Sequence, residues 1–130
     1  MCYKISKSLS SDLMKIKHDL EMIINNLKEV LRDETLVFDA RLIIDELICN
    51  GVIHGNKSDE TKKVKLNIEI SDSLIKIEVM DQGEGFVYNK EDYDPMKLTC
   101  NGRGLKIVDG LSDEFIIQNN KAISIKYLKK

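Results

Sequence analysis

Asp81-Gln82-Gly83-Glu84-Gly85-Phe86 is the stretch of this 130-residue chain from which the rest is best interpreted. It follows residues 74–79, where apolar and polar side chains alternate as they do in a strand. Gly83 and Gly85 permit backbone conformations closed to other residues, so the main chain can approach a flat ligand. Asp81 is then placed to accept a hydrogen bond from an exocyclic amine. Taken alone, the motif is more often a turn or a calcium-like loop, but the regularly spaced further oxygen ligands of a calcium loop are missing.

A second polar motif lies upstream, where Glu46, Asn50 and His54 recur every four residues. On a helix over residues 37–53, ended by Gly55, this spacing keeps the three side chains on one stripe. A carboxylate, an amide oxygen and an imidazole that face one space suit a hydrated divalent cation and a reacting hydroxyl. Mg²⁺ prefers oxygen ligands, and Glu46 could accept a proton from a nucleophile. The alternative is an ordinary solvated helix face, and for His54 we expect packing or hydrogen bonding at the helix end rather than catalysis.

A third motif, Gly102-Arg103-Gly104, stands before an apolar run that predicts a short helix through Leu111. Free N–H groups at the start of a helix attract phosphate. The motif is not a Walker loop, because no Gly-Lys-Ser/Thr follows, and it is not a Rossmann loop, because no strand precedes it within a βαβ unit. Alone it is an ordinary entry to a helix. Three such segments in this order within 130 residues predict a nucleotide site.

The remaining sequence predicts the frame around these motifs. Ser10, Ser11 and Asp12 can cap an amphipathic helix over residues 11–32, whose apolar residues recur at spacings of three and four. Alternating segments predict strands at 2–9, 64–70, 74–79 and a closing hairpin at 115–117 and 122–127, while residues 86–101 show little periodicity. The clean alternation of the middle two strands predicts a sheet with one buried and one more polar face.

Composition narrows the function classes. A hydrophobic fraction of 42% and a charged fraction of 32% are typical of a globular protein, and the length suits a single domain over residues 1–130. A net charge of −2 argues against a nucleic-acid partner held through phosphates. No apolar run approaches the roughly 20 residues that cross a bilayer, and no signal peptide is evident. The three cysteines show no metal-ligand spacing, so we expect reduced thiols in a cytoplasmic protein.

With these motifs the chain resembles the GHKL ATPase superfamily. Within it, the chain is most similar to the small anti-sigma-factor serine kinases of bacterial sporulation and stress-response switches. The resemblance covers nearly the whole chain and is carried by Glu46-Leu47-x-x-Asn50-x-x-x-His54-Gly55, Asp81-x-Gly83-x-Gly85-Phe86 and Gly102-x-Gly104-Leu105-x-Ile107-Val108. It implies an α+β fold: a two-layer α/β sandwich, the Bergerat fold, with helices on one face of a mixed, mostly antiparallel sheet.

The resemblance also implies a role for each matching residue toward ATP and Mg²⁺. Asn50 would be the magnesium ligand, Glu46 the general base, and Asp81 the partner of the adenine amine. Gly83 and Gly85 would shape the pocket, and residues 87–101 would form the ATP lid. Gly102, Gly104 and Leu105 would belong to the segment whose amides hold phosphates. Arg103 could reach a terminal phosphate.

Two positions depart from the family pattern. Gly51 replaces the alanine that the family usually carries after the motif asparagine, and glycine inside a helix costs about 1 kcal/mol relative to alanine. The family also tends to place Gly-Thr before its last strand, where this chain has Asn120-Lys121-Ala122.

The function implied is an ATP-dependent serine/threonine protein kinase that is also an anti-sigma factor. It would bind a sigma factor and phosphorylate an anti-anti-sigma protein, with no direct nucleic-acid or membrane partner. The resemblance also suggests a homodimer through the first strand and helix, unless the monomer's own core uses both. One alternative is a non-catalytic module of the same fold whose nucleotide gates a protein contact. Another is the catalytic domain of a histidine kinase, which we do not favour because no phosphoacceptor helix pair precedes the ATP motifs.

Overall fold

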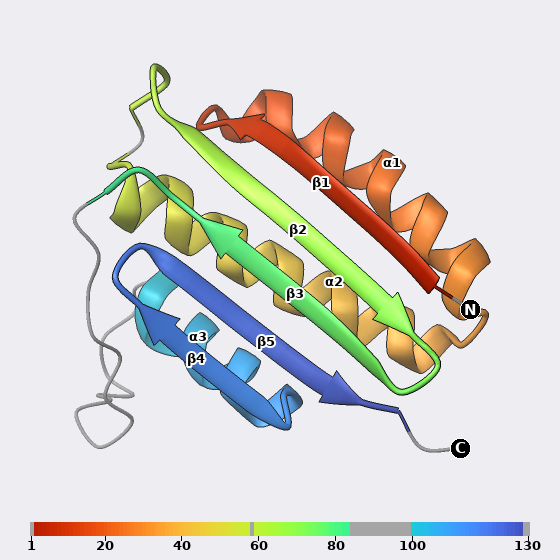
Figure 1. Cartoon of the computed structure of the whole chain (residues 1–130). Coiled ribbons are helices and arrows are strands. Elements are labelled where there is room, and N and C mark those ends of the chain that lie inside the picture. The colour runs from red at the N-terminus through yellow and green to blue at the C-terminus, as the bar shows by residue number, and fades with distance from the viewer. Residues whose placement is uncertain (1, 58, 84–99, 129–130) are drawn as a thin grey trace.

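A five-stranded sheet carries the helices of the described residues on one face (Figure 1). The computed structural model describes residues 2–57, 59–83 and 100–128, apart from the side chains of 54 and 100–104. The elements in chain order are β1 (Cys2–Ser10), α1 (Leu13–Leu31), α2 (Glu34–Cys49), η1 (Asn50–Gly55), β2 (Lys63–Ser71), β3 (Leu74–Met80), α3 (Cys100–Leu111), β4 (Glu114–Gln118) and β5 (Lys121–Tyr127). The predicted α+β two-layer sandwich is confirmed.

The strand order is β1-β2-β3-β5-β4, and all four pairings among the described strands are antiparallel. The expected mixed sheet is therefore corrected to an antiparallel one. The reason lies in the connection through α3, which returns the chain so that β4 runs in the same direction as β3. The β4–β5 hairpin then inserts β5 between these two strands, so that no parallel neighbours result.

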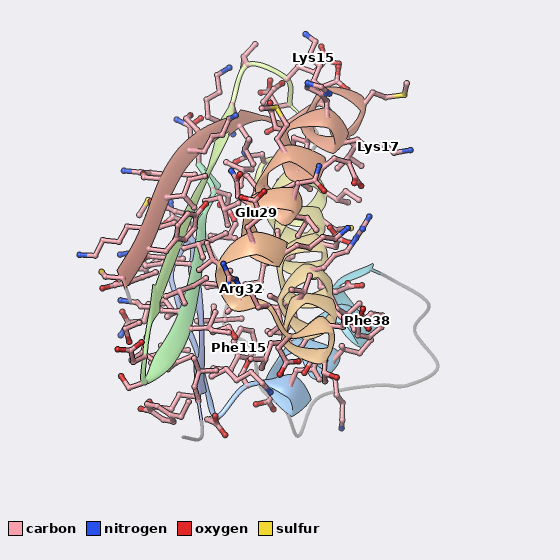
Figure 2. The ribbon with its side chains drawn as sticks, turned by 90° about the vertical axis from the view of Figure 1, so that its right-hand side faces the viewer. Lys15, Lys17, Glu29, Arg32, Phe38 and Phe115 are labelled. Carbon is pink, nitrogen blue, oxygen red and sulfur yellow. The ribbon has the colours of Figure 1, made fainter. Side chains whose placement is uncertain are left out.

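The predicted alternation of the two middle strands is confirmed in the structure. The buried positions recur at every second residue: Val64, Leu66, Ile68 and Ile70 in β2, and Ile75, Ile77 and Val79 in β3. The side view in Figure 2 shows the sheet as one layer and the helices as the other. Apolar side chains of α1 and α2 fill the space between the layers, chiefly Ile16, Ile23, Ile24, Leu27, Ile43, Ile44, Leu47 and Ile48.

Side-chain caps set the start of both long helices. Asp12 accepts from the backbone N–H of Met14 at 2.9 Å, which confirms the predicted capping region of α1. Asp33 accepts from Thr35 and Leu36 at 2.9 and 3.1 Å and starts α2 at Glu34. The second helix therefore begins three residues before the sequence pattern predicted, because the cap precedes the first apolar residue of the stripe.

Candidate functional site

Two predicted site residues from separate motifs meet in one cleft. Asn50, at the end of α2, and Asp81, just after β3, both line a small cleft that the β4–β5 turn closes from the opposite side. Its other lining residues come from the same elements: Leu47, Gly51, Val79, Ile117, Asn119, Asn120, Lys121 and Ala122. One residue of each of the first two sequence motifs thus lines the same cleft, and the binding of a nucleotide there stays a prediction.

Asn50 presents a side-chain oxygen that no other described residue satisfies. The residue is 4% exposed, and its Oδ1 is the buried side-chain nitrogen or oxygen atom that lacks a hydrogen-bond partner within the described residues. An unpaired buried acceptor costs about 1–3 kcal/mol, so one in a native protein calls for an explanation. The described residues contain no cluster of three or more His, Cys, Asp or Glu side chains that could hold a metal. A single amide oxygen, supplemented by phosphate oxygens and water, nevertheless fits Mg²⁺.

Glu46 lies one helical turn before Asn50 on α2 and is half-buried. Burial raises the pKa of its carboxyl above the ordinary value, and the negative charge of neighbouring Asp45 raises it further. A raised pKa makes the carboxylate a stronger proton acceptor. The raised pKa is compatible with the predicted general base, and that role of Glu46 stays a prediction.

The backbone changes from α-helix to π-helix at the motif itself. α2 ends at Cys49, and residues Asn50–Gly55 form η1, in which the N–H of Asn56 donates to the carbonyl of Gly51 at 2.8 Å, five residues back. The α-helical spacing behind the predicted stripe therefore holds from Glu46 to Asn50, and the backbone from Asn50 onward is a π turn with a different rotation per residue. The side chain of His54 lies outside the described part of the structure.

Asp81 is a buried carboxylate, 7% exposed. Burial raises the pKa of this carboxyl, while a backbone hydrogen bond from Gly83 and the positive charge of Lys62 partly offset the effect. The N–H of Gly83 donates to Asp81 Oδ1 at 2.8 Å. A desolvated carboxylate at the end of a strand suits the predicted hydrogen bond from an adenine amine.

Glycines bring η1 against the segment that carries Asp81. A Cβ atom on Gly55 would lie 2.1 Å from Asp81 Oδ2, and one on Gly83 would lie 2.0 Å from the carbonyl oxygen of Gly55. Neither approach is compatible with a side chain. By contrast, a Cβ on Gly51 would meet Val79 and Val64 at 3.5 and 3.6 Å, which is ordinary contact. Gly55 and Gly83 are thus required by close packing, whereas Gly51 is not.

The third motif begins differently from the prediction. α3 starts at Cys100, so Gly102, Arg103 and Gly104 lie inside the beginning of the helix rather than before it. Leu105, whose backbone was expected near the phosphates, has its side chain in the core at 2% exposure. The side chain of Arg103 and all of Gly85 and residues 87–99 of the expected lid lie outside the described residues. The roles of these residues toward ATP stay predictions.

Two asparagines that the motif analysis missed hold the Asp81 segment. Asn120 accepts from the N–H of Asp81 through its carbonyl at 2.9 Å and donates through its side chain to the carbonyl of Asp81. On the other side, Asn56 Oδ1 accepts from the N–H of Gln82 at 2.7 Å. Both asparagines stand in short polar segments between predicted elements, where this residue is common for local reasons, so nothing in their local pattern indicates these long-range contacts.

The fold is a two-layer α/β sandwich with a cleft between α2, β3 and the β4–β5 hairpin. A family of known sequences described as the histidine kinase-like ATPase domain matches residues 10–126. The chain therefore belongs to the histidine kinase-like ATPase domain family.

Its relatives include proteins of bacterial regulation. The chain is 27% identical over 99 residues to the anti-sigma F factor of Geobacillus sp. (strain WCH70), and the alignment covers 71% of this chain and 67% of that protein. It is 32% identical over 105 residues to the serine-protein kinase RsbW of Staphylococcus epidermidis, which covers 71% of this chain and 66% of the relative. The predicted resemblance is thereby confirmed.

Two expectations from composition can be compared with the structure. None of the helices in the described ranges is long and apolar enough to cross a membrane. Of the cysteines with described side chains, Cys2 is free and exposed, whereas Cys49 is disulfide-bonded. The expectation of reduced thiols is therefore wrong for Cys49.

Proposed function

We propose that this protein is an ATP-dependent serine/threonine protein kinase that also acts as an anti-sigma factor. One observation carries the proposal: the unpaired Oδ1 of Asn50 and the buried carboxylate of Asp81 lie in the same cleft. These are the two groups needed at opposite ends of a nucleotide, one toward the phosphates and one toward the base. The names of the relatives, anti-sigma F factor and serine-protein kinase, support the same function.

Each residue of the proposed site has a separate task. Asp81 accepts from the adenine amine, and Gly83 and Gly85 shape the pocket, Gly83 through its close packing against the carbonyl of Gly55. Asn50 supplies a ligand to Mg²⁺, which when bound neutralises charge on the phosphate oxygens. Glu46 accepts the proton of the attacking serine hydroxyl, and its raised pKa favours that step. Phosphoryl transfer depends mainly on such positioning and charge stabilisation.

The phosphate end of the proposed site is the beginning of α3. The first N–H groups of a helix have no partner within the helix, and they attract anions. With α3 starting at Cys100, the free N–H groups of this turn extend to Arg103, so Gly102 is proposed to lie among the phosphate-binding amides and Gly104 and Leu105 to follow directly after them. Arg103 is proposed to reach the terminal phosphate. We propose residues 87–101 as the lid over the nucleotide, with the end of that range already inside α3.

The proposed partners are a sigma factor and an anti-anti-sigma protein that accepts the phosphoryl group, in the cytoplasm and without direct contact with nucleic acid or membrane. A homodimer of single-domain subunits remains part of the proposal. The apolar stripe of α1 does not argue for it, since Ile16, Ile23 and Leu27 are already buried in the core of one chain.

Calorimetric titration with ATP, with and without Mg²⁺, tests the binding half of the proposal. We expect Asp81→Asn to abolish binding and Asn50→Ala to weaken binding of Mg-ATP more than that of ATP alone. Equal losses in the two titrations of Asn50→Ala would contradict its role as a magnesium ligand.

Transfer of the γ-phosphate of ATP to a purified anti-anti-sigma protein tests the catalytic half. Glu46→Gln should bind ATP as the wild-type protein does and transfer nothing. Unchanged transfer by this variant would exclude Glu46 as the base. ATP binding by the wild-type protein without transfer would select the non-catalytic module.

A further inference from the structure

Asn56 is a fully buried polar residue, 0% exposed, that lies just outside the motif carrying Asn50. Its Nδ2 donates to Ser11 Oγ at 2.9 Å and to the carbonyl of Lys63 at 3.0 Å. Its Oδ1 accepts from the backbone N–H of Gln82 at 2.7 Å. A single amide group therefore joins the end of η1 to three other segments, two of which are distant in the sequence.

We propose that Asn56 is a positioning residue for the nucleotide site, acting through the backbone of Gln82 on the carboxylate of Asp81. This inference rests on the proposed function. Gln82 stands between Asp81 and Gly83, and the N–H of Gly83 bonds back to Asp81 Oδ1 at 2.8 Å. Asn56 accepts from the N–H of the Asp81–Gln82 peptide, and the return bond comes from the N–H of the following Gln82–Gly83 peptide. Asn56 therefore fixes, from a different element, the peptide from which the turn back to the Asp81 carboxylate begins.

The hydrogen bonds around Asp81 show why this contact matters. On the strand side, Asn120 holds the N–H and the carbonyl of Asp81 itself. On the other side, Asn56 holds the N–H of Gln82, which belongs to the same peptide group as the Asp81 carbonyl, and Gln82 Oε1 accepts from the N–H of Lys63. Loss of Asn56 Oδ1 leaves this peptide group held by Asn120 alone, and the turn back to the Asp81 carboxylate is then less restrained.

The two halves of the Asn56 amide can be separated by substitution. Nδ2 binds Ser11 and Lys63, which belong to the frame, whereas Oδ1 binds the segment of the site. Asn56→Ala removes both halves. Asn56→Asp keeps an acceptor for Gln82 but loses the donors. Ser11→Ala disturbs the frame half alone and is the matched control, because Ser11 Oγ also donates to the carbonyl of Lys62 at 2.8 Å.

The experiment is calorimetric titration of the four proteins with ATP and with GTP, in the presence of Mg²⁺ and well below each melting temperature. GTP carries a carbonyl where ATP carries the amine, so the ratio of the two affinities reports how well the Asp81 carboxylate is placed. We expect Asn56→Ala to lower ATP affinity about tenfold and to reduce the ATP-to-GTP ratio, which corresponds to one or two hydrogen bonds. Asn56→Asp should recover most of the ratio, and Ser11→Ala should melt earlier with wild-type affinities.

A purely structural role predicts a different result. If Asn56→Ala and Ser11→Ala both melt earlier but bind ATP and GTP in the wild-type ratio, the positioning role is refuted. Amide hydrogen exchange at Gln82 and Gly83 in the absence of nucleotide provides a readout independent of binding, and it should accelerate in Asn56→Ala but not in Ser11→Ala. Wild-type protein that binds neither nucleotide would refute the proposed function, and the exchange rates would then decide by themselves whether Asn56 holds this segment.

Discussion

Replacing Gly83 by alanine should damage both the stability of the fold and the nucleotide site. A Cβ at this position would lie 2.0 Å from the carbonyl oxygen of Gly55 and 2.7 Å from its carbonyl carbon. Real Cβ atoms essentially never approach another heavy atom closer than 3.0 Å, so the two segments must separate by roughly 1 Å. Hydrogen bonds hold the backbone of both segments in place, the one at the end of η1 and the one beside Asp81.

The size of the two effects can be estimated from the displacement of the segment that carries Gly83. Overpacking of this kind costs about 1–3 kcal/mol, and each backbone hydrogen bond broken by the displacement adds about 1 kcal/mol. We therefore expect Gly83→Ala to lower the free energy of unfolding by about 2–4 kcal/mol. Because the displaced segment carries the Asp81 carboxylate, ATP affinity should fall at least tenfold, a change of about 1.4 kcal/mol.

Urea denaturation measures the first quantity and calorimetric titration with ATP the second. Gly110→Ala is the matched control: Gly110 lies in α3, and a Cβ there would meet nothing within 4 Å. The control should gain about 0.5–1 kcal/mol, as expected for glycine to alanine in an exposed helix. If Gly83→Ala unfolds at the same urea concentration as Gly110→Ala, or binds ATP within twofold of the wild-type protein, the close packing of Gly55 on Gly83 is not what holds the site.

Three further substitutions test single statements about the site. Gly51→Ala should raise the free energy of unfolding by about 0.5–1 kcal/mol, because its Cβ would meet Val79 and Val64 only at ordinary contact distance; a loss in urea denaturation would show that η1 requires glycine. Asp81→Asn should abolish ATP binding without lowering the melting temperature at neutral pH. The pKa of Asp81 is raised in the folded protein, so ionisation of this carboxyl destabilises the fold as the pH rises through that pKa. Between acid and neutral pH, the melting temperature of Asp81→Asn should therefore rise relative to that of the wild-type protein. Because the pKa of Glu46 is raised, phosphoryl transfer should be lost on lowering the pH at a higher pH than for an ordinary glutamate. A pH–rate profile without a fall in rate above the pKa of an ordinary glutamate would exclude Glu46 as the base.

Much of the fold could be predicted because its signals are local. Alternation in β2 and β3, the apolar stripe of α1 and the turn at Asn119-Asn120 each depend on residues close in sequence. Asn119 adopts a positive φ of 55°, a conformation that asparagine tolerates better than most residues. The purely antiparallel sheet was harder to predict, because it depends on where α3 returns the chain and not on the composition of any strand.

The parts of the site that were missed depend on contacts between distant segments. The change to a π-helix after Cys49 breaks the four-residue spacing, and nothing in the apolar pattern of residues 47–53 marks it. α3 begins at Cys100, whereas the sequence pattern predicts its start after Gly104. Asn56 and Asn120 bind the same short segment from opposite sides, and only the assembled sheet brings them together.

The side-chain oxygen of Asn50 should contribute to nucleotide binding but not to the stability of the fold, and this difference gives a last prediction. Asn50 Oδ1 is buried without a partner among the described residues, so replacing Asn50 by leucine, which has a similar shape, removes an unsatisfied acceptor. We expect Asn50→Leu without nucleotide to unfold within about 1 kcal/mol of the wild-type protein, or to be more stable. With Mg-ATP at a hundred times its dissociation constant, the wild-type protein should gain about 2.7 kcal/mol, whereas Asn50→Leu should gain much less at the same concentration. Thermal unfolding with and without Mg-ATP measures both effects. A large loss of stability in the ligand-free variant would mean that Asn50 serves the fold, and an undiminished gain on adding Mg-ATP would mean that its oxygen does not face the bound nucleotide.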